Sequence, residues 1–171
     1  MTDIMIDLET LGTGHDAYIL SIGACDVLNS NRTFYVNTAN TNQDRAIDVD
    51  TVTWWMQQSE EARKVFTEDS IVLPAALRDL ADWMLDGTEP GDLKVWSHGA
   101  TFDIPILQHA YKQYKIDCPW GFWNARDTRT VYDLTGLDVE RPERKGTHHN
   151  ALDDALWQSE YLRRCFEHFG V

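Results

Sequence analysis

The sequence has few cysteines, few basic residues and no long apolar run. Its three cysteines (Cys25, Cys118 and Cys165) are odd in number and widely spaced. This spacing argues against a disulfide framework or a zinc ribbon and fits a reducing cytoplasm. No apolar run approaches the roughly 20 residues that a membrane span needs, and the N-terminus lacks the regions of a secretory signal. We therefore expect a cytoplasmic protein without membrane association.

Basic residues are scarce: 15 Lys and Arg stand against 28 Asp and Glu, which gives a formal net charge of −13. The imbalance lies in residues 1–93, which hold 17 acids and 5 bases, whereas residues 94–171 hold 11 acids and 10 bases. Such a balance disfavours binding of long duplexes through a broad basic face. A small or single-stranded substrate, a metal site or a protein partner remains open.

Repeats, low-complexity tracts and flexible linkers are also lacking, so we expect one domain spanning residues 1–171. The expected strands are residues 4–8, 18–28, 33–37, 94–97 and 121–124. The expected helices are residues 50–58 with Asp50 as N-cap, 74–85, 102–114, a helix ending at 134, and 151–169. This order predicts an α/β fold in which three consecutive strands precede helix-linked ones.

Two carboxylates, Asp7 and Glu9, lie at the end of the first predicted strand, where side chains two residues apart share a face. Burying both costs heavily unless a cation is present, and the alternative is a solvated strand end. Asp103 follows a strand and begins a helix. One interpretation is an acid at a helix N-terminus, where the helix macrodipole stabilises its negative charge. The other is a carboxylate that faces a ligand, because binding sites in α/β sheets lie at strand ends.

A histidine pair opens the last predicted helix, and two registers compete: His148 with Asp153, or His149 with Asp154. At roughly 100° per residue, Asp154 falls roughly 110° from the centre of the apolar stripe, and Asp153 roughly 150° from it on the other side. We therefore expect Asp154 at the edge of a site and Asp153 in solvent, which favours His149 and Asp154. The alternative is a histidine at a helix start with no function.

The four carboxylates come from three elements that an α/β fold can bring to one crevice. Oxygen ligands suit Mg²⁺ or Mn²⁺ better than Zn²⁺. A histidine with a pKa near 6.5 can take a proton from water. Together they predict hydrolysis of a phosphodiester with two metal ions roughly 3.5–4 Å apart.

Three segments, DLET at 7–10, ATFD at 100–103 and HNALDD at 149–154, resemble the motifs of the DEDDh family of 3′→5′ exonucleases. Residues 51–63 and 122–129 are similar to the phage exonuclease A type of this family, which is related to a mycobacterial 3′→5′ exoribonuclease. The resemblance implies a ribonuclease H-like fold: a mixed five-stranded sheet flanked by helices. Gly99 departs from the second motif, in which many members carry Asn.

The family's functional residues can be carried over at these motif positions. Asp7, Glu9 and Asp154 would bind two Mg²⁺ or Mn²⁺ ions, with Asp103 on the second ion directly or through water and His149 as general base. The expected substrate contacts are Thr10, Leu11, Gly12 and Phe102. The implied activity is release of 5′-mononucleotides from a single-stranded 3′ end, with DNA favoured over RNA. The alternatives are an exoribonuclease, a phosphatase or nucleotide hydrolase, and an idle binding module. Dimers occur in the family, so a homodimer is conceivable.

Two further regions carry expectations of their own. Trp54 and Trp55 point about 100° apart on a helix, so one is expected in the core and the other on a substrate base or at a partner interface. The basic segment 141–147 is predicted to be a mobile loop in which Arg144 and Lys145 contact phosphates and help to move His149 into place. The alternative is a solvated connector. Arg126 and Arg129 could bind a phosphate or pair with Asp127 or Asp133.

Overall fold

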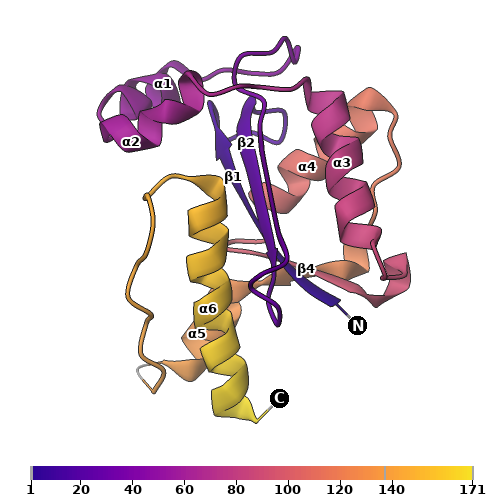
Figure 1. Ribbon diagram of the computed structural model, residues 1–171, viewed down its shortest axis with the longest axis vertical. Coiled ribbons are helices and arrows are strands. Elements are labelled where there is room, and N and C mark those ends of the chain that lie inside the picture. Colours follow the sequence, from indigo (N-terminus) through magenta and orange to yellow (C-terminus); the bar gives the residue numbers. More distant parts are fainter. Residues whose placement is uncertain (1, 137, 171) are drawn as a thin grey trace.

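In the computed structural model, which describes residues 2–136 and 138–170, a five-stranded sheet lies between two layers of helices (Figure 1). The strands are β1 (Thr2–Thr10), β2 (Ile19–Asp26), β3 (Thr33–Asn37), β4 (Leu93–Ser97) and β5 (Ala125–Asp127). Their order is β3-β2-β1-β4-β5; β1–β2 and β2–β3 pair antiparallel, and β1–β4 and β4–β5 pair parallel. The expected α/β fold with a mixed five-stranded sheet is confirmed.

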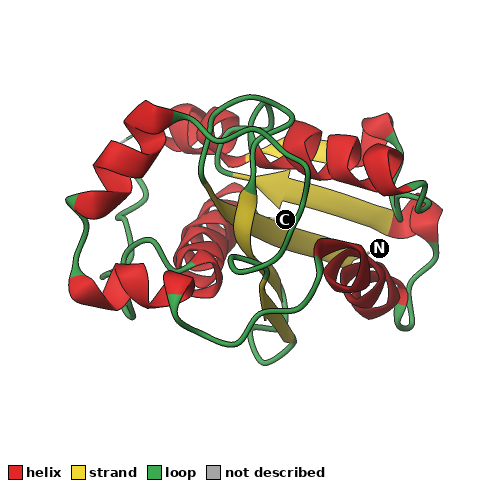
Figure 2. Ribbon diagram, turned by 90° about the horizontal axis from the view of Figure 1, so that it is seen from above, coloured by secondary structure: helices red, strands yellow, loops and turns green. Residues whose placement is uncertain are grey.

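Helices cover both faces of this sheet (Figure 2). They are α1 (Val49–Met56), α2 (Glu60–Arg63), α3 (Leu73–Leu85), α4 (Asp103–Tyr114), α5 (Thr128–Thr135) and α6 (Ala151–Phe169), with 3₁₀ turns at Lys64–Phe66, Pro90–Asp92 and Phe122–Asn124. Figure 1 shows α3 and α4 on one side of the sheet, α5 and α6 on the other, and α1 and α2 near one end of the strands. The predicted helix at residues 151–169 matches α6 at both ends.

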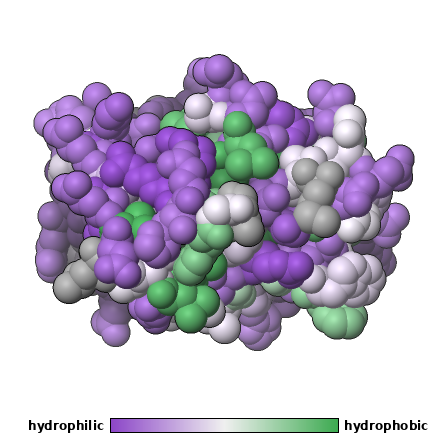
Figure 3. All heavy atoms as spheres, turned by 90° about the horizontal axis from the view of Figure 1, so that it is seen from below, coloured by the Kyte–Doolittle hydropathy of each residue, from purple (hydrophilic) through white to green (hydrophobic). Residues whose placement is uncertain are grey.

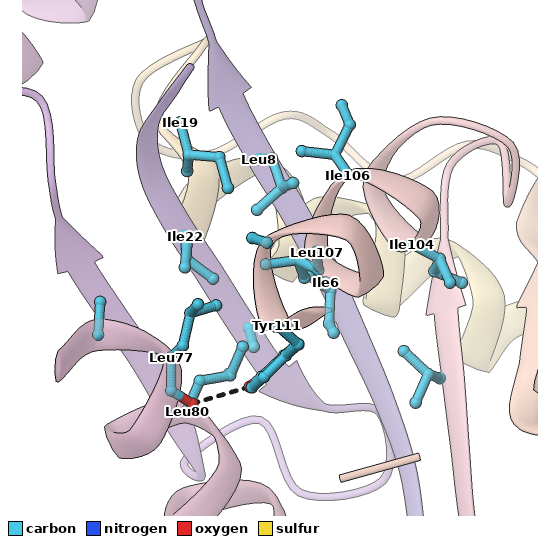
Figure 4. Close-up of a cluster of buried hydrophobic side chains, with 14 of the residues drawn as sticks. Ile6, Leu8, Ile19, Ile22, Leu77, Leu80, Ile104, Ile106, Leu107 and Tyr111 are labelled. Atoms are coloured by element: carbon cyan, nitrogen blue, oxygen red, sulfur yellow. Dashed lines mark hydrogen bonds between the residues drawn. The ribbon is translucent and has the colours of Figure 1, made fainter. Parts of the chain in front are cut away.

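The main core fills the space between the sheet and the α3–α4 layer (Figure 4). Ile6 and Ile22 from neighbouring strands meet Leu77 and Leu107 from the two helices, and all four are buried. The hydroxyl of Tyr111 donates a hydrogen bond to the carbonyl of Leu77 (2.8 Å), which joins α4 to α3. A second buried cluster lies under α5 and α6. Because β1 is covered on both faces, its middle residues 4–6 are continuously apolar.

Two local predictions were wrong. The last strand is Ala125–Asp127, whereas residues 121–124 form a turn. The turn closes because the side chain of Asn124 accepts from the Gly121 amide (2.8 Å) and donates to the Leu93 carbonyl (2.5 Å). Asp50 is not the N-cap of α1: the helix begins at Val49 after Asp48.

None of the helices in the described residues is both long and apolar enough to cross a membrane. The view from below shows a mainly hydrophilic surface on which apolar side chains occupy a few small areas (Figure 3). Scattered exposed apolar residues of this kind are usual on protein surfaces.

Candidate active site

The end of β1 carries two of the predicted site residues. Asp7 lies opposite Gly23 of β2, Glu9 lies opposite Ser21, and the register shifts between Glu9 and Thr10. Such an irregularity bends a strand and re-aims its side chains. The two carboxylates share one face of the sheet, which is the face covered by α6.

Gly23 lets the start of α6 rest directly on the sheet beside Asp7. A Cβ atom at position 23 would lie 2.2 Å from the carbonyl carbon of Ala151, so only glycine fits. About two turns into α6, the side-chain amide of Gln158 donates to Asp7 Oδ1 (2.7 Å). Neither Gly23 nor Gln158 was predicted from the sequence. A glycine within an apolar strand was the available signal for Gly23, whereas nothing local marked Gln158.

Asp103 joins α4 to β1. It is the first residue of α4, only 3% exposed, and its Oδ1 accepts a hydrogen bond from the backbone amide of Leu8 (3.1 Å). That bond fixes its carboxyl next to the strand segment between Asp7 and Glu9. The turn before it contains Gly99 at φ +104°, a conformation that residues with a side chain rarely adopt.

His149 and Asp154 lie together at the start of α6, and the structure places Glu9 beside them. A ring nitrogen of His149 and carboxylate oxygens of Glu9 and Asp154 lie within 4.8 Å of one another. The backbone amide of His149 donates to Asp154 Oδ2 (3.2 Å). His149 has φ +64°, which costs energy for a residue with a side chain and is found where the surroundings enforce it.

Asp153 does not face solvent as the helix phase predicted. Its side chain is partly buried, and its Oδ2 accepts a hydrogen bond from the backbone amide of Thr147 (2.6 Å). Gly146 (φ +75°) leaves room for it, because a Cβ at position 146 would lie 2.3 Å from the carboxyl carbon of Asp153. Asp153 therefore holds the segment that leads into the two histidines.

Burial and mutual repulsion control the charge of the carboxylates. Desolvation, followed by the charges of Asp103 and Glu9, raises the pKa of Asp7 well above its usual value. Desolvation and Asp103 raise the pKa of Glu9 to about 8. Desolvation also raises the pKa of Asp103 to about 7, although its bond from Leu8 opposes the shift. Full ionisation of these carboxyl groups therefore costs free energy unless a cation binds among them.

The imidazole of His149 is neutral at pH 7. Burial, followed by the neighbouring His148 and Arg144, lowers its pKa to about 4. The ring stands edge-on to Trp54 (centroids 4.7 Å apart) and to His148 (3.9 Å). A neutral imidazole held beside carboxylates can accept a proton from water.

In the predicted basic loop, Arg144 lies at the carboxylate cluster and Lys145 lies away from it. Arg144 forms an ion pair with Asp154, lies over the ring of Trp157 (5.1 Å), and lowers the pKa values of Asp7 and Glu9. Lys145 is exposed and lines a separate pocket of about 480 Å³ along the outer side of α6, which includes none of the four predicted carboxylates.

A pocket of about 420 Å³ opens beside the carboxylates. Its lining comprises Leu8, Glu9, Thr10, Gly12, Thr13, Asp50, Thr51, Trp54 and Phe102. Trp54 is 40% exposed, whereas Trp55 is 2% exposed and donates its indole N–H to the Thr10 carbonyl (2.8 Å). Trp55 is therefore the core residue of the expected pair, and Trp54 is the one that lines the pocket. Leu11 packs toward the cluster around Trp55 and is absent from the pocket lining.

β1, α4 and α6 bring carboxylates and a histidine to one end of a sheet with this strand order. This arrangement defines a DEDDh-type nuclease of the ribonuclease H-like fold. The nuclease domain of 3′hExo, a DEDDh family member solved with rAMP, is similar with a TM-score of 0.62 and 13% identity, covering 99% of this chain and 92% of that one. Cell-death related nuclease 4 (CRN-4) has a TM-score of 0.66 and 13% identity over 99% of this chain, which spans 64% of CRN-4. S. pombe Pop2p in its Mg²⁺- and Mn²⁺-bound form has a TM-score of 0.54 and 15% identity, covering 98% and 84%.

The chain belongs to the family of the 3′-5′ exoribonuclease Rv2179c-like domain, whose family model matches residues 2–166. It is also 23% identical to the exodeoxyribonuclease of Enterobacteria phage T4, over 95% of this chain and 90% of that protein. The protein is therefore a 3′-5′ exonuclease of the DEDDh type, and the resemblance stated from its motifs is confirmed.

Proposed function

We propose that the protein removes 5′-mononucleotides from the 3′ end of single-stranded nucleic acid in a reaction that needs divalent metal ions. The observation that carries this proposal is the meeting of Glu9, Asp154 and His149 within 4.8 Å. Asp7 and Asp103 stand close enough for their charges to act on one another. Carboxylates and a neutral base are the groups that metal-assisted hydrolysis requires.

The donor set fits Mg²⁺ or Mn²⁺. Asp7, Glu9, Asp103 and Asp154 offer only oxygen ligands, which these hard cations prefer. Burial raises the pKa values of the first three, so a bound cation would stabilise their charged forms. Pop2p, which shares the fold, was solved with both metals. Two ions bound by these residues would activate a water and stabilise the departing 3′ oxygen.

The side chains and backbone of the protein would supply the general base and orient the carboxylates. His149 accepts the proton of the attacking water, and its backbone bond to Asp154 keeps the imidazole at the cluster. Gln158 holds one oxygen of Asp7 and the Leu8 amide holds one oxygen of Asp103, so both carboxylates have a fixed orientation. Arg144 supplies positive charge beside Asp154, and its guanidinium would bind the scissile phosphate.

The 420 Å³ pocket would hold the terminal nucleotide. It adjoins Glu9 and is walled by Trp54 and Phe102, whose rings can contact a base. The Thr10 hydroxyl donates to the Gly12 carbonyl (2.7 Å), which fixes the turn that would meet the sugar. The similar nuclease domain of 3′hExo was solved with the mononucleotide rAMP.

Replacing Trp54 with alanine is expected to weaken single-strand binding about tenfold, because base–aromatic stacking contributes roughly 1–3 kcal/mol. Fluorescence anisotropy of a labelled oligonucleotide in EDTA measures this without turnover. Met56→Ala is the matched control, since Met56 is exposed on the same helix and outside the pocket lining. Equal affinities for both variants would show that Trp54 does not contact the strand.

DNA is the first candidate substrate, because the curated relative is an exodeoxyribonuclease. RNA is the second, because the matched family is described as exoribonuclease. Matched DNA and RNA strands of one sequence, compared by kcat/KM, distinguish the two.

The direct test uses strands labelled at the 5′ end with Mg²⁺, Mn²⁺ or EDTA. We expect a ladder that shortens one nucleotide at a time with either metal and no shortening in EDTA. A strand with a blocked 3′ end and a circular strand should stay intact. Cleavage of the circle, or shortening in EDTA, would contradict the proposal.

Without metal, the protein should lose stability as pH rises from about 5 to about 8. Glu9 and Asp103 ionise near 4 in an unfolded chain, whereas their folded pKa values are about 8 and about 7. Between these values the two carboxyl groups bind fewer protons in the unfolded state, so they lower the free energy of unfolding as pH rises. His149, whose folded pKa is about 4, acts in the opposite direction only below its ordinary pKa of about 6.5 and is one group against two. We expect Tm in EDTA to drop by about 5 °C or more across this window.

Divalent ions bind the charged carboxylates, so Mn²⁺ should raise Tm more at pH 8 than at pH 5. Differential scanning fluorimetry measures both Tm values. Asp79→Asn serves as control, because Asp79 is exposed on α3. Equal Mn²⁺-induced increases at the two pH values would count against a metal site at these carboxylates.

A further inference from the structure

The guanidinium of Arg129 lies over the turn that leads to Asp103. Arg129 is in the first turn of α5, and a Cβ atom built on Gly99 would lie 3.5 Å from its Cζ and 3.6 Å from its Nη1. A longer side chain at position 99 would take this space. The Gly99 turn runs directly into α4, whose first residue is Asp103.

Arg129 is exposed and has no acidic partner among the described residues. Asp127 Oδ1 accepts a hydrogen bond from the backbone amide of Arg129 (2.9 Å). Neither Asp127, Asp133 nor any other described carboxylate forms an ion pair with the Arg129 guanidinium. Arg126 differs, since its Nη1 donates to the carbonyls of Trp123 (2.7 Å) and Ala125 (2.9 Å). Of these two arginines, only Arg129 is available to a ligand.

Thr128, the residue before Arg129, anchors the start of α5 to the end of β4. His98, which follows β4, is hydrogen-bonded to Thr128 Oγ1 (3.1 Å). In a chain with 28 acids, an exposed guanidinium that lies over this turn and pairs with none of the described acids points to an anion from outside.

We infer that Arg129 binds a backbone phosphate of the substrate on the 5′ side of the scissile bond. The inference rests on the proposed function. The pocket for the terminal nucleotide is lined from the end of β1, from α1 and by Phe102, whereas Arg129 begins α5 directly after the edge strand β5, beyond β4 from β1 in the sheet. A strand whose 3′ nucleotide fills the pocket and whose scissile phosphate meets the carboxylates would pass Arg129 if it continued toward the β5 edge.

The test compares Arg129→Ala with Arg78→Ala, an exposed arginine on α3 at the other face of the sheet. The substrates are a single-stranded oligonucleotide and the p-nitrophenyl ester of thymidine 5′-monophosphate, which has no second phosphate. For the oligonucleotide we expect Arg129→Ala to raise KM about tenfold, to leave kcat within about twofold, and to reduce the salt dependence of binding by about one phosphate contact. For the ester, kcat/KM should stay unchanged.

Arg129→Lys keeps the charge without the two-pronged hydrogen bonding, so its KM should lie between those of the wild type and Arg129→Ala. An equal loss of kcat on both substrates would overturn the inference, because Arg129 would then act by positioning Asp103. Behaviour like that of Arg78→Ala would also overturn it. If the wild type cleaves neither substrate, the proposed function fails, while oligonucleotide anisotropy in EDTA still shows whether Arg129 binds the strand.

Discussion

Asp7→Asn is expected to lower kcat about a thousandfold or more on every substrate. Asparagine has the shape of aspartate and can still accept the hydrogen bond from Gln158, so the fold should survive while one negative charge is lost. That charge belongs to the carboxylate cluster in which the charges of Asp103 and Glu9 raise the pKa of Asp7. A bound cation would offset this repulsion. Loss of an ion removes both the activated water and the stabilised leaving group.

Single-turnover kinetics with saturating Mn²⁺ measure the effect on the chemical step, and Tm in EDTA checks the fold. The matched control is Asp79→Asn, which changes the same charge on the exposed side of α3. A rate for Asp7→Asn within about tenfold of the wild type would remove Asp7 from the proposed metal ligands.

His149→Asn should lower kcat by about a hundredfold to ten-thousandfold, the range for loss of a general base. Asparagine suits this position because the backbone has φ +64°, and asparagine tolerates left-handed conformations better than alanine does. His148→Asn should change kcat by less than about tenfold, since His148 does not share the cluster of Glu9 and Asp154.

The two variants also separate the registers at the start of α6. Both histidine rings are close, with centroids 3.9 Å apart, so proximity alone does not assign the base. A greater loss for His148→Asn than for His149→Asn would refute the proposed role of His149. Oligonucleotide anisotropy in EDTA distinguishes a catalytic loss from a loss of substrate binding.

The parts of the site that could be predicted are those set by short-range geometry. Asp7 and Glu9 are two residues apart on a strand, and His149 and Asp154 span the first turn of a helix, so strand and helix periodicity were enough to place them on common faces. The same periodicity predicted solvent exposure for Asp153. It failed because Thr147 and Gly146 fold back over that side chain, a contact that helix phase does not contain.

The parts that could not be predicted depend on segments that meet only in the folded chain. Gln158 and Asp7 are separated by 151 positions, and no local pattern links them. The strand Ala125–Asp127 is short and only half-buried, so it lacks the alternation that marks a strand. The aromatic residues before it suggested β structure, but the hydrogen bonds of Asn124 close a turn there.

The carboxylates are drawn from nearly the whole length of the chain, and this order has a consequence for synthesis. Asp7 and Glu9 leave the ribosome well before Asp154 and the helix that packs on Gly23. Domains fold as their segments emerge, from the N-terminus onward. A nascent chain that has not yet made α6 and the turn before it therefore lacks His149 and Asp154, and it becomes able to degrade a nearby strand only after this helix has emerged.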